Sequence, residues 1–197
     1  MSRIFLGFDP GAAMSFGWCA LTISGSDQNP EIKTGTCSAA HETFAATAAS
    51  INDKPSAVGI NAPMYWSTGM ERMADQILRG RVLSLGDKSG TVSPVNSLSG
   101  ACLAQGVMVA ALCRERWSAI PVTESHPEAL LLTCPEAKLF LSERDFNNEH
   151  ERNAALAAYT AWAYDDQSDG WHDLRSFESD TYEPIPGPPP IYWFPGG

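Results

Sequence analysis

The pattern of apolar and polar positions predicts three neighbouring strands at the start of the chain. In residues 3–8 (RIFLGF), apolar side chains fall on both sides of the alternating strand pattern, and residues 16–23 (FGWCALTI) have the same character. Residues 32–37 follow a turn-forming sequence and complete the group. Strands that are apolar on both faces belong in the middle of a sheet that helices cover. We therefore predict an antiparallel meander of three strands, to which later strands add in an α/β fold.

Helices alternate with short buried strands in the rest of the pattern, up to residue 164. Apolar residues at helical spacing and capping residues predict the helices, whereas short apolar runs predict the strands. This alternation indicates one layered α/β domain that spans residues 1–197. The predicted helices cover 41–51, Ser67 or Thr68 to about Gly80, Ser97 or Ser99 to about Trp117, 134–143 and 149–164, and the predicted strands cover 56–60 and 120–124.

The tail over residues 165–197 has a different composition. Its last part, EPIPGPPPIYWFPGG, holds six of the fourteen prolines, too many for regular structure. The same part carries Tyr192, Trp193 and Phe194, which would gain nothing from exposure in a solvated linker. We expect an extended segment that packs on the domain.

Composition and charge narrow the class of protein. The formal net charge is −10, from 13 Lys and Arg against 23 Asp and Glu, which counts against broad binding of long nucleic acid but not against a local contact with a nucleic acid or nucleotide. No apolar run approaches the ~20 residues of a membrane helix, and the first one is too short for a signal peptide. The five cysteines contain no CxxC pair. We therefore expect a cytoplasmic protein with reduced thiols.

Polar residues follow three of the predicted strands at the point where each strand ends. These residues are Asp9, Asn61 and Glu124, and the carboxyl edge of an open α/β sheet is where ligands bind. Asn153 lies in the first turns of the late helix and shares a face with Glu149. Oxygen ligands that converge there would suit Mg²⁺ or Mn²⁺. The alternative is ordinary turn chemistry, because an Asp before Pro-Gly commonly caps a loop.

The motif FLGFDPGAAMSFGWCAL resembles the first strand of the ribonuclease H-like superfamily, in particular the opening of the Holliday-junction resolvases. Over nearly the whole chain, the order FDPG…FGW, GINAPMYW, ERMADQILRGR, NSLSGA, ESHPEA, HERNAALAAYTAWA and YWFP resembles the DUF429 family of predicted nucleases with that fold. The resemblance implies a central mixed sheet flanked by helices and a metal-dependent cleavage of phosphodiesters. It implies no particular substrate, because the family's activity is inferred from its fold.

Carried over by position, the resemblance implies that Asp9 and Glu124 are the main metal ligands. Two positions depart from the family pattern: Asn61 stands in place of the Asp of Asp-Ala-Pro, and Asn153 in place of a helical Asp before Ala. Each exchange removes a negative charge that a two-metal site would use, and Glu149 could replace part of it. The implied catalytic set is Asp9, Glu124, Asn61 and Asn153, with a one-metal or an inactive site as alternatives.

Basic and imidazole side chains are the candidate substrate contacts. Arg72 and Arg79 share a helix face, where they either bind a substrate phosphate or form a salt-bridge ladder with Asp75. His126 and His150 are candidates for a general base or for a group that supports the metal ligands. Three functions follow: a metal-dependent nuclease or phosphodiesterase with a weakened metal site, a non-catalytic nucleic-acid- or nucleotide-binding protein that keeps the fold, and, more distantly, a nucleotide-phosphate binder of the actin-like ATPase type. The short chain, without a duplicated domain, counts against the third. The two asparagines and the acidic composition favour the second.

Overall fold

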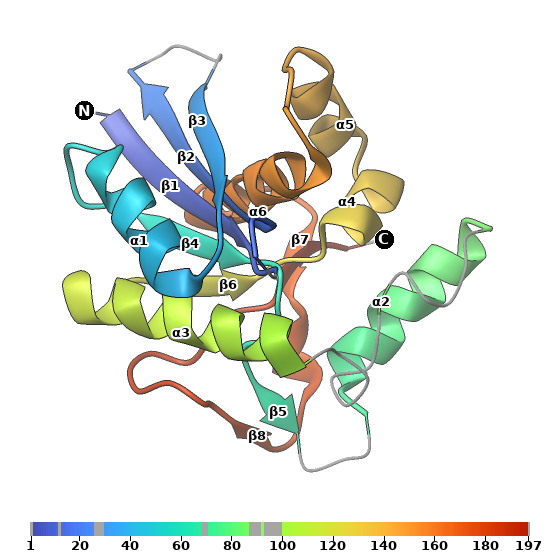
Figure 1. Cartoon of the computed structure of the whole chain (residues 1–197). Coiled ribbons are helices and arrows are strands. Elements are labelled where there is room, and N and C mark those ends of the chain that lie inside the picture. Colours follow the sequence, from blue (N-terminus) through green and yellow to red (C-terminus); the bar gives the residue numbers. More distant parts are fainter. Residues whose placement is uncertain are drawn as a thin grey trace.

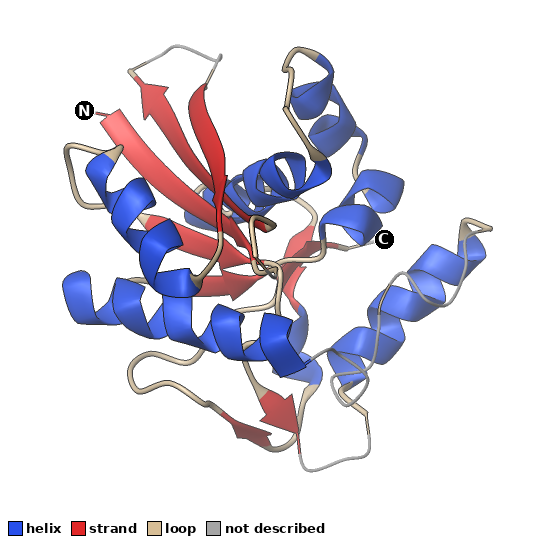
Figure 2. Cartoon of the chain, in the orientation of Figure 1, coloured by secondary structure: helices blue, strands red, loops and turns tan. Residues whose placement is uncertain are grey.

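A five-stranded mixed sheet forms the centre of the protein (Figures 1 and 2). The structure is a computed structural model, and it describes residues 2–11, 13–25, 30–67, 71–86, 92 and 100–196. The strands are β1 (Ser2–Asp9), β2 (Phe16–Ser24), β3 (Glu31–Cys37), β4 (Ala57–Ile60) and β6 (Val122–Glu124). Their order is β3-β2-β1-β4-β6, in which the first three pair antiparallel and β1, β4 and β6 pair parallel. The prediction of an antiparallel meander within a mixed sheet flanked by helices is confirmed.

Helix α6 (Glu149–Asp165) covers one face of the sheet at very short range. A Cβ atom on Gly7 of β1 would lie 1.9 Å from the carbonyl oxygen of Ala154, and one on Gly59 of β4 would lie 1.8 Å from that of Ala157. The backbone of α6 therefore rests directly on the backbones of both strands, with alanines on the helix and glycines on the sheet. This contact fixes the first turn of α6 beside the carboxyl ends of β1 and β4.

The opposite face of the sheet carries α1 (Ala40–Ala49) and α3 (Gly100–Arg116) (Figure 1). Phe8 of β1 and Ile60 of β4 are fully buried on that side, in one cluster with Val109 and other residues of α3. Successive residues of a strand point to opposite faces, so the neighbours of Phe8 and Ile60 point toward α6. Among the described residues, no helix has the length and apolar character of a transmembrane span.

The start of α2 (Met73–Ser84) differs from the prediction, which placed the cap at Ser67 or Thr68. Ser67 instead lies in the short strand β5 (Trp66–Ser67), which pairs with β8 (Thr181–Tyr182). The partner strand is more than one hundred residues away in the sequence, so the local pattern of capping residues could not reveal it. The other predicted caps lie outside the described residues: Thr68, Ser97 and Ser99.

Two short helices, α4 (Pro127–Thr133) and α5 (Pro135–Ser142), occupy the segment between β6 and α6. Only α5 was predicted, over residues 134–143. Each helix has a proline in its first turn, where the missing N–H leaves no hydrogen bond unmade. The proline that begins α4 was therefore a start signal that the sequence analysis did not use.

The proline-rich tail is hydrogen-bonded to the domain along its length. Ile191 runs beside β6, because its N–H donates to the carbonyl oxygen of Val122 at 2.9 Å and its carbonyl accepts from the N–H of Glu124 at 2.8 Å. Tyr192 is fully buried. Arg114 of α3 donates to the carbonyl oxygens of residues 185 and 186 at 3.3 and 3.0 Å. The tail ends in β9 (Trp193–Pro195), which pairs with β7 (Trp171–Asp173).

Candidate functional site

Asp9 lies at the carboxyl end of β1, with only 5 % of its surface exposed. Its side chain points toward α6, because it follows Gly7 by two residues along the strand. Asn61, the residue after β4, donates from Nδ2 to Oδ1 of Asp9 at 2.7 Å. His150, in the first turn of α6, places Nδ1 2.8 Å from Oδ2 of Asp9. Together with Asn153, one turn further along α6, these residues form what we call the Asp9 site.

The surroundings of Asp9 act on its pKa in both directions. Burial penalises the charged carboxylate and raises the pKa above its usual value, whereas hydrogen bonds from Asn61, His150 and Asn153 lower it. Burial is the larger effect, so the pKa is raised overall. The side chain of His150 is 31 % exposed, so the site meets solvent on that side. A carboxyl group with a raised pKa beside a partly exposed imidazole is typical of a functional site.

The Asp9→Asn variant is expected to be more stable than the wild type at pH 7, by about 1 kcal/mol, when divalent cations are removed with EDTA. A raised pKa means that the carboxyl group stabilises the fold below its unfolded pKa and that this contribution is lost as the pH rises through the folded pKa. The uncharged amide avoids the loss, so the advantage of the variant should shrink in acid. Urea unfolding at several pH values measures it. A variant that is clearly less stable than the wild type at pH 7 would contradict this account of Asp9.

Glu124 lies at the carboxyl end of β6 but on the other face of the sheet. The register aligns Phe8 with Ile60 and Ile60 with Glu124 across the three parallel strands. Aligned residues point to the same face, so the side chain of Glu124 leaves the sheet on the α3 side, opposite to that of Asp9. Strand β4 also separates the two backbones by about 10 Å. Three of the four predicted catalytic residues therefore meet at one point: Asp9, Asn61 and Asn153. Glu124 belongs to a different group on the other face.

Glu124 forms a buried ion pair with Arg72, the residue before α2. Arg72 donates from Nη1 and Nη2 to the two carboxylate oxygens of Glu124 at 2.8 and 2.7 Å, and from Nε and Nη2 to those of Asp75 at 2.9 and 2.7 Å. The rings of Tyr65 and Tyr192 flank the guanidinium, with centroids 4.7 and 5.5 Å from Cζ. These five residues form the Arg72 cluster, in which one guanidinium hydrogen-bonds to all four carboxylate oxygens.

The partners of Glu124 stabilise its negative charge. Burial alone would raise the pKa of this carboxyl group, but Arg72 and His126 outweigh burial and hold the pKa well below its usual value. Nε2 of His126 lies 2.9 Å from Oε1 of Glu124, and the imidazole stacks on Tyr192 with centroids 5.1 Å apart. Glu124 is therefore ionised at neutral pH and paired on two sides.

Two groups of residues come into question as metal sites. Asp75, Glu124 and His126 place ligand atoms within 4.8 Å of one another, close enough to hold a metal ion. In that group, however, the guanidinium of Arg72 already supplies the positive charge, and a cation would have to displace it at the cost of a buried ion pair. The carboxylate of Asp9 accepts one hydrogen bond from each neighbour and keeps further lone pairs. One carboxylate with nearby amide oxygens fits a single hard cation that a substrate phosphate also ligates.

The remaining predicted residues are not among the hydrogen-bond partners of Asp9, which are Asn61, His150 and Asn153. Arg79 binds the carboxylate of Glu71 and donates from Nε to the carbonyl oxygen of residue 92 at 3.1 Å, whereas Arg72 is the N-cap residue at the start of the same helix. Glu149 is exposed at the start of α6. His126 is bound to Glu124, on the other face of the sheet from Asp9. The ion pair of Arg72 with Asp75 that the sequence allowed is present, whereas Arg72 is only 3 % exposed and so lies out of reach of a substrate phosphate.

Aromatic residues play a part in the Arg72 cluster that the sequence pattern does not reveal. Tyr65 follows the predicted strand end closely, but Tyr192 comes from the tail, and no spacing rule connects it with residue 72. Two tyrosines that flank a buried guanidinium stabilise it through cation–π contacts. The only available signal was the improbability of three exposed aromatic residues in a proline-rich tail.

Comparisons of the chain with family models, with curated proteins and with solved structures find no match. The resemblance to the ribonuclease H-like nucleases therefore remains an expectation from the sequence.

Proposed function

We propose that the protein is a phosphodiester hydrolase of ribonuclease H-like type, that it uses one Mg²⁺ or Mn²⁺ ion, and that the Asp9 site is its active site. The observation that carries the proposal is the buried carboxylate of Asp9, held between Asn61 and the partly exposed His150 at the carboxyl ends of two parallel strands. That edge is where open α/β sheets bind their ligands. The order of strands and helices that accompanies the motif FDPG supports the ribonuclease H-like assignment.

Asp9 and the amide oxygen of Asn61 are the groups that would hold the cation, whereas Oδ1 of Asn153 accepts hydrogen bonds from the Arg152 guanidinium at 3.0 and 3.3 Å. A bound divalent cation would neutralise charge on the phosphate and polarise its oxygens. Burial helps Asp9 in this role, since an incompletely solvated carboxylate gains more from a nearby positive charge. With one carboxylate, the site has too little negative charge for two such ions.

His150 is the group we assign to proton transfer. When Asp9 is ionised it can only accept hydrogen bonds, so Nδ1 of His150 donates to it and Nε2 keeps a free lone pair. Nε2 can then take a proton from a water molecule as the water oxygen attacks phosphorus and the bond from phosphorus to the leaving oxygen breaks. The leaving oxygen takes a proton from solvent, and the imidazolium returns its own to solvent. Asp9 thus orients the base as well as binding the cation.

Cleavage of short DNA and RNA oligonucleotides in Mg²⁺ or Mn²⁺ tests the proposal. We expect cleavage that EDTA abolishes and that Asp9→Asn and His150→Ala each lower by a factor of about one hundred or more. Asp53→Asn is the matched control, because Asp53 is exposed and lies in the turn after α1, away from the site. Cleavage that needs no metal, or that Asp9→Asn leaves unchanged, would contradict the assignment.

A non-catalytic binding protein is the second candidate function. The observation that favours it is the commitment of Glu124, the second acidic residue of the resemblance, to Arg72. Oligonucleotide or nucleotide binding without cleavage, at equal affinity for the wild type and Asp9→Asn, would support this candidate over the first.

A further inference from the structure

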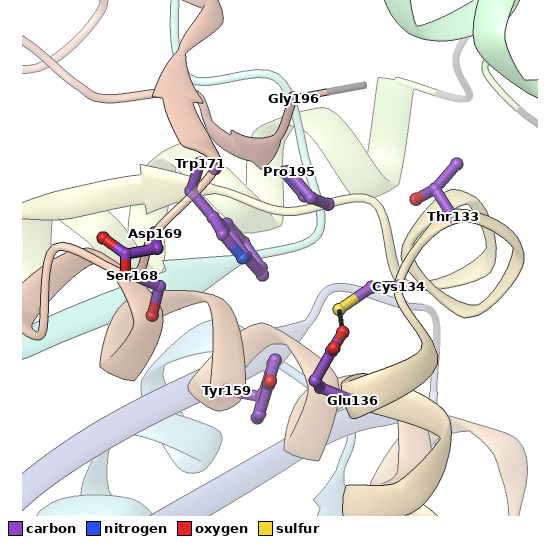
Figure 3. Close-up of a pocket in the computed structure, with 10 residues that line it drawn as sticks. Thr133, Cys134, Glu136, Tyr159, Ser168, Asp169, Trp171, Pro195 and Gly196 are labelled. Carbon is purple, nitrogen blue, oxygen red and sulfur yellow. Dashed lines mark hydrogen bonds between the residues drawn. The ribbon is translucent and has the colours of Figure 1, made fainter.

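A cavity of about 360 Å³ lies where the junction of α4 and α5 meets the ribbon of β7 and β9 (Figure 3). It is separate from the Asp9 site. Tyr159, which lines it, follows Asn153 by six residues on α6, which corresponds to about 9 Å along the helix and about 240° around it. The volume falls within the range of small-molecule pockets, at its lower end.

Two aromatic rings form part of the wall of this cavity. The centroids of Tyr159 and Trp171 lie 6.2 Å apart with the ring planes inclined at 54°. Figure 3 shows both rings turned toward the middle of the group of lining residues. Trp171 is packed in the core with Phe194, so the indole is held in place before any ligand enters. The faces of aromatic rings carry partial negative charge, which attracts a cation.

The charges at the cavity are negative. Glu136 and Asp169 line it, and none of its lining residues, all of which the structure describes, is a lysine, an arginine or a histidine. Glu136 accepts a hydrogen bond from the buried thiol of Cys134 at 3.4 Å. Burial raises the pKa of Tyr159, and the negative charge of Glu136 raises it further. The phenol of Tyr159 is therefore neutral at pH 7.

The chemistry of the wall selects among ligand classes. An anion would be repelled by two carboxylates, and the start of α5 offers it little, because Pro135 has no N–H and Glu136 stands in the first turn. A neutral apolar ligand would remove water from the carboxylates without offering them a hydrogen bond or an opposite charge in return. A cation with an apolar shell is attracted both by the carboxylates and by the ring faces.

We propose that this cavity binds a small organic ammonium ion, either a quaternary ammonium or a protonated amine with a short apolar body. Trp171 and Tyr159 contact the apolar groups around the nitrogen, and Glu136 supplies the opposite charge. Asp169 adds to this charge from the edge of the cavity, with its carboxylate turned away from the rings (Figure 3). The site is independent of the proposed hydrolase activity.

Isothermal titration calorimetry with tetramethylammonium chloride and choline chloride tests the proposal on the full chain. Sodium chloride at the same ionic strength is the baseline, and 3,3-dimethylbutan-1-ol is the neutral counterpart of choline. We expect saturable binding of both cations and none of the alcohol. Glu136→Gln should weaken choline binding about fivefold, and the double variant with Asp169→Asn should weaken it further.

Glu143→Gln is the matched control, because Glu143 is exposed at the other end of α5 and does not line the cavity. It should leave choline affinity unchanged. Glu136 and Asp169 are both exposed, so the test variants should fold as the wild type does. Equal binding of the alcohol and choline, full affinity in the double variant, or no saturable binding of either cation at millimolar concentration would each overturn the proposal.

Discussion

Arg72→Met is expected to destabilise the protein by about 3 to 5 kcal/mol at pH 7. Arg72 is 3 % exposed and is bound to the carboxylates of Asp75 and Glu124, which are fully buried. Methionine fills part of the space between the two tyrosines, but it removes the guanidinium from two buried carboxylates, and His126 remains beside only one of them, that of Glu124. The loss is therefore much larger than that of a surface salt bridge, which contributes about 0 to 1 kcal/mol.

The effect of Arg72→Met should depend on pH in a defined direction. The pKa of Glu124 is held low in the fold, so its ionisation stabilises the protein above its unfolded pKa, and this contribution is lost as the pH falls through the folded pKa. The gap between wild type and variant should therefore be widest near neutrality and narrow in acid. Arg79→Met is the control, because Arg79 is only partly buried and binds Glu71; it should cost no more than about 1 kcal/mol. Equal losses for the two variants in urea unfolding would contradict a central role for the Arg72 cluster.

Gly59→Ala is expected to destabilise the protein by about 3 kcal/mol or more. The added methyl group would lie 1.8 Å from the carbonyl oxygen of Ala157, and backbone atoms of a helix cannot move aside alone. Helix α6 would have to shift away from β4 as a unit and would carry His150 and Asn153 with it. We therefore expect that any folded fraction of the variant also loses the hydrogen bond between His150 and Asp9.

Gly80→Ala provides the matched control for this prediction. Gly80 lies within α2, and a Cβ atom there meets nothing within 4 Å, so alanine should stabilise the helix by about 0.5 to 1 kcal/mol. Thermal unfolding of both variants measures the change in stability, and the chemical shifts of the His150 ring report whether its hydrogen bond to Asp9 is kept. A Gly59→Ala protein of wild-type stability would mean that α6 does not rest on β4 as described.

Local pattern was sufficient to predict most of the sheet and helices. Apolar residues dominate the runs at 3–8, 16–23 and 56–60, and strands lie at each of them. The runs are apolar throughout because helices cover both faces of the sheet. Local pattern could not predict the pairing of β5 with β8 or the late start of α2. They depend on a tail segment whose place on the domain is set by contacts, not by its own pattern.

The candidate site was predictable in part for a similar reason. Asp9 and Asn61 follow strands that a parallel pairing brings side by side, and helical spacing placed Asn153 near them. The position of Glu124 depends on the register of β6 against β4, and a shift of one residue moves a side chain to the other face. The sequence does not specify that register by itself. The pairing of Glu124 with Arg72 was hidden for the same reason.

A crystal structure with Mn²⁺, in which anomalous scattering locates the metal, tests the central claim most directly. The claim is that chemistry belongs to the Asp9 site, whereas Glu124 serves the stability of the fold. The account predicts one Mn²⁺ ion on the carboxylate of Asp9, with Arg72 still bound to Glu124 and Asp75. An ion held by Asp75, Glu124 and His126 with Arg72 displaced, or no ion at Asp9 at millimolar Mn²⁺, would contradict it.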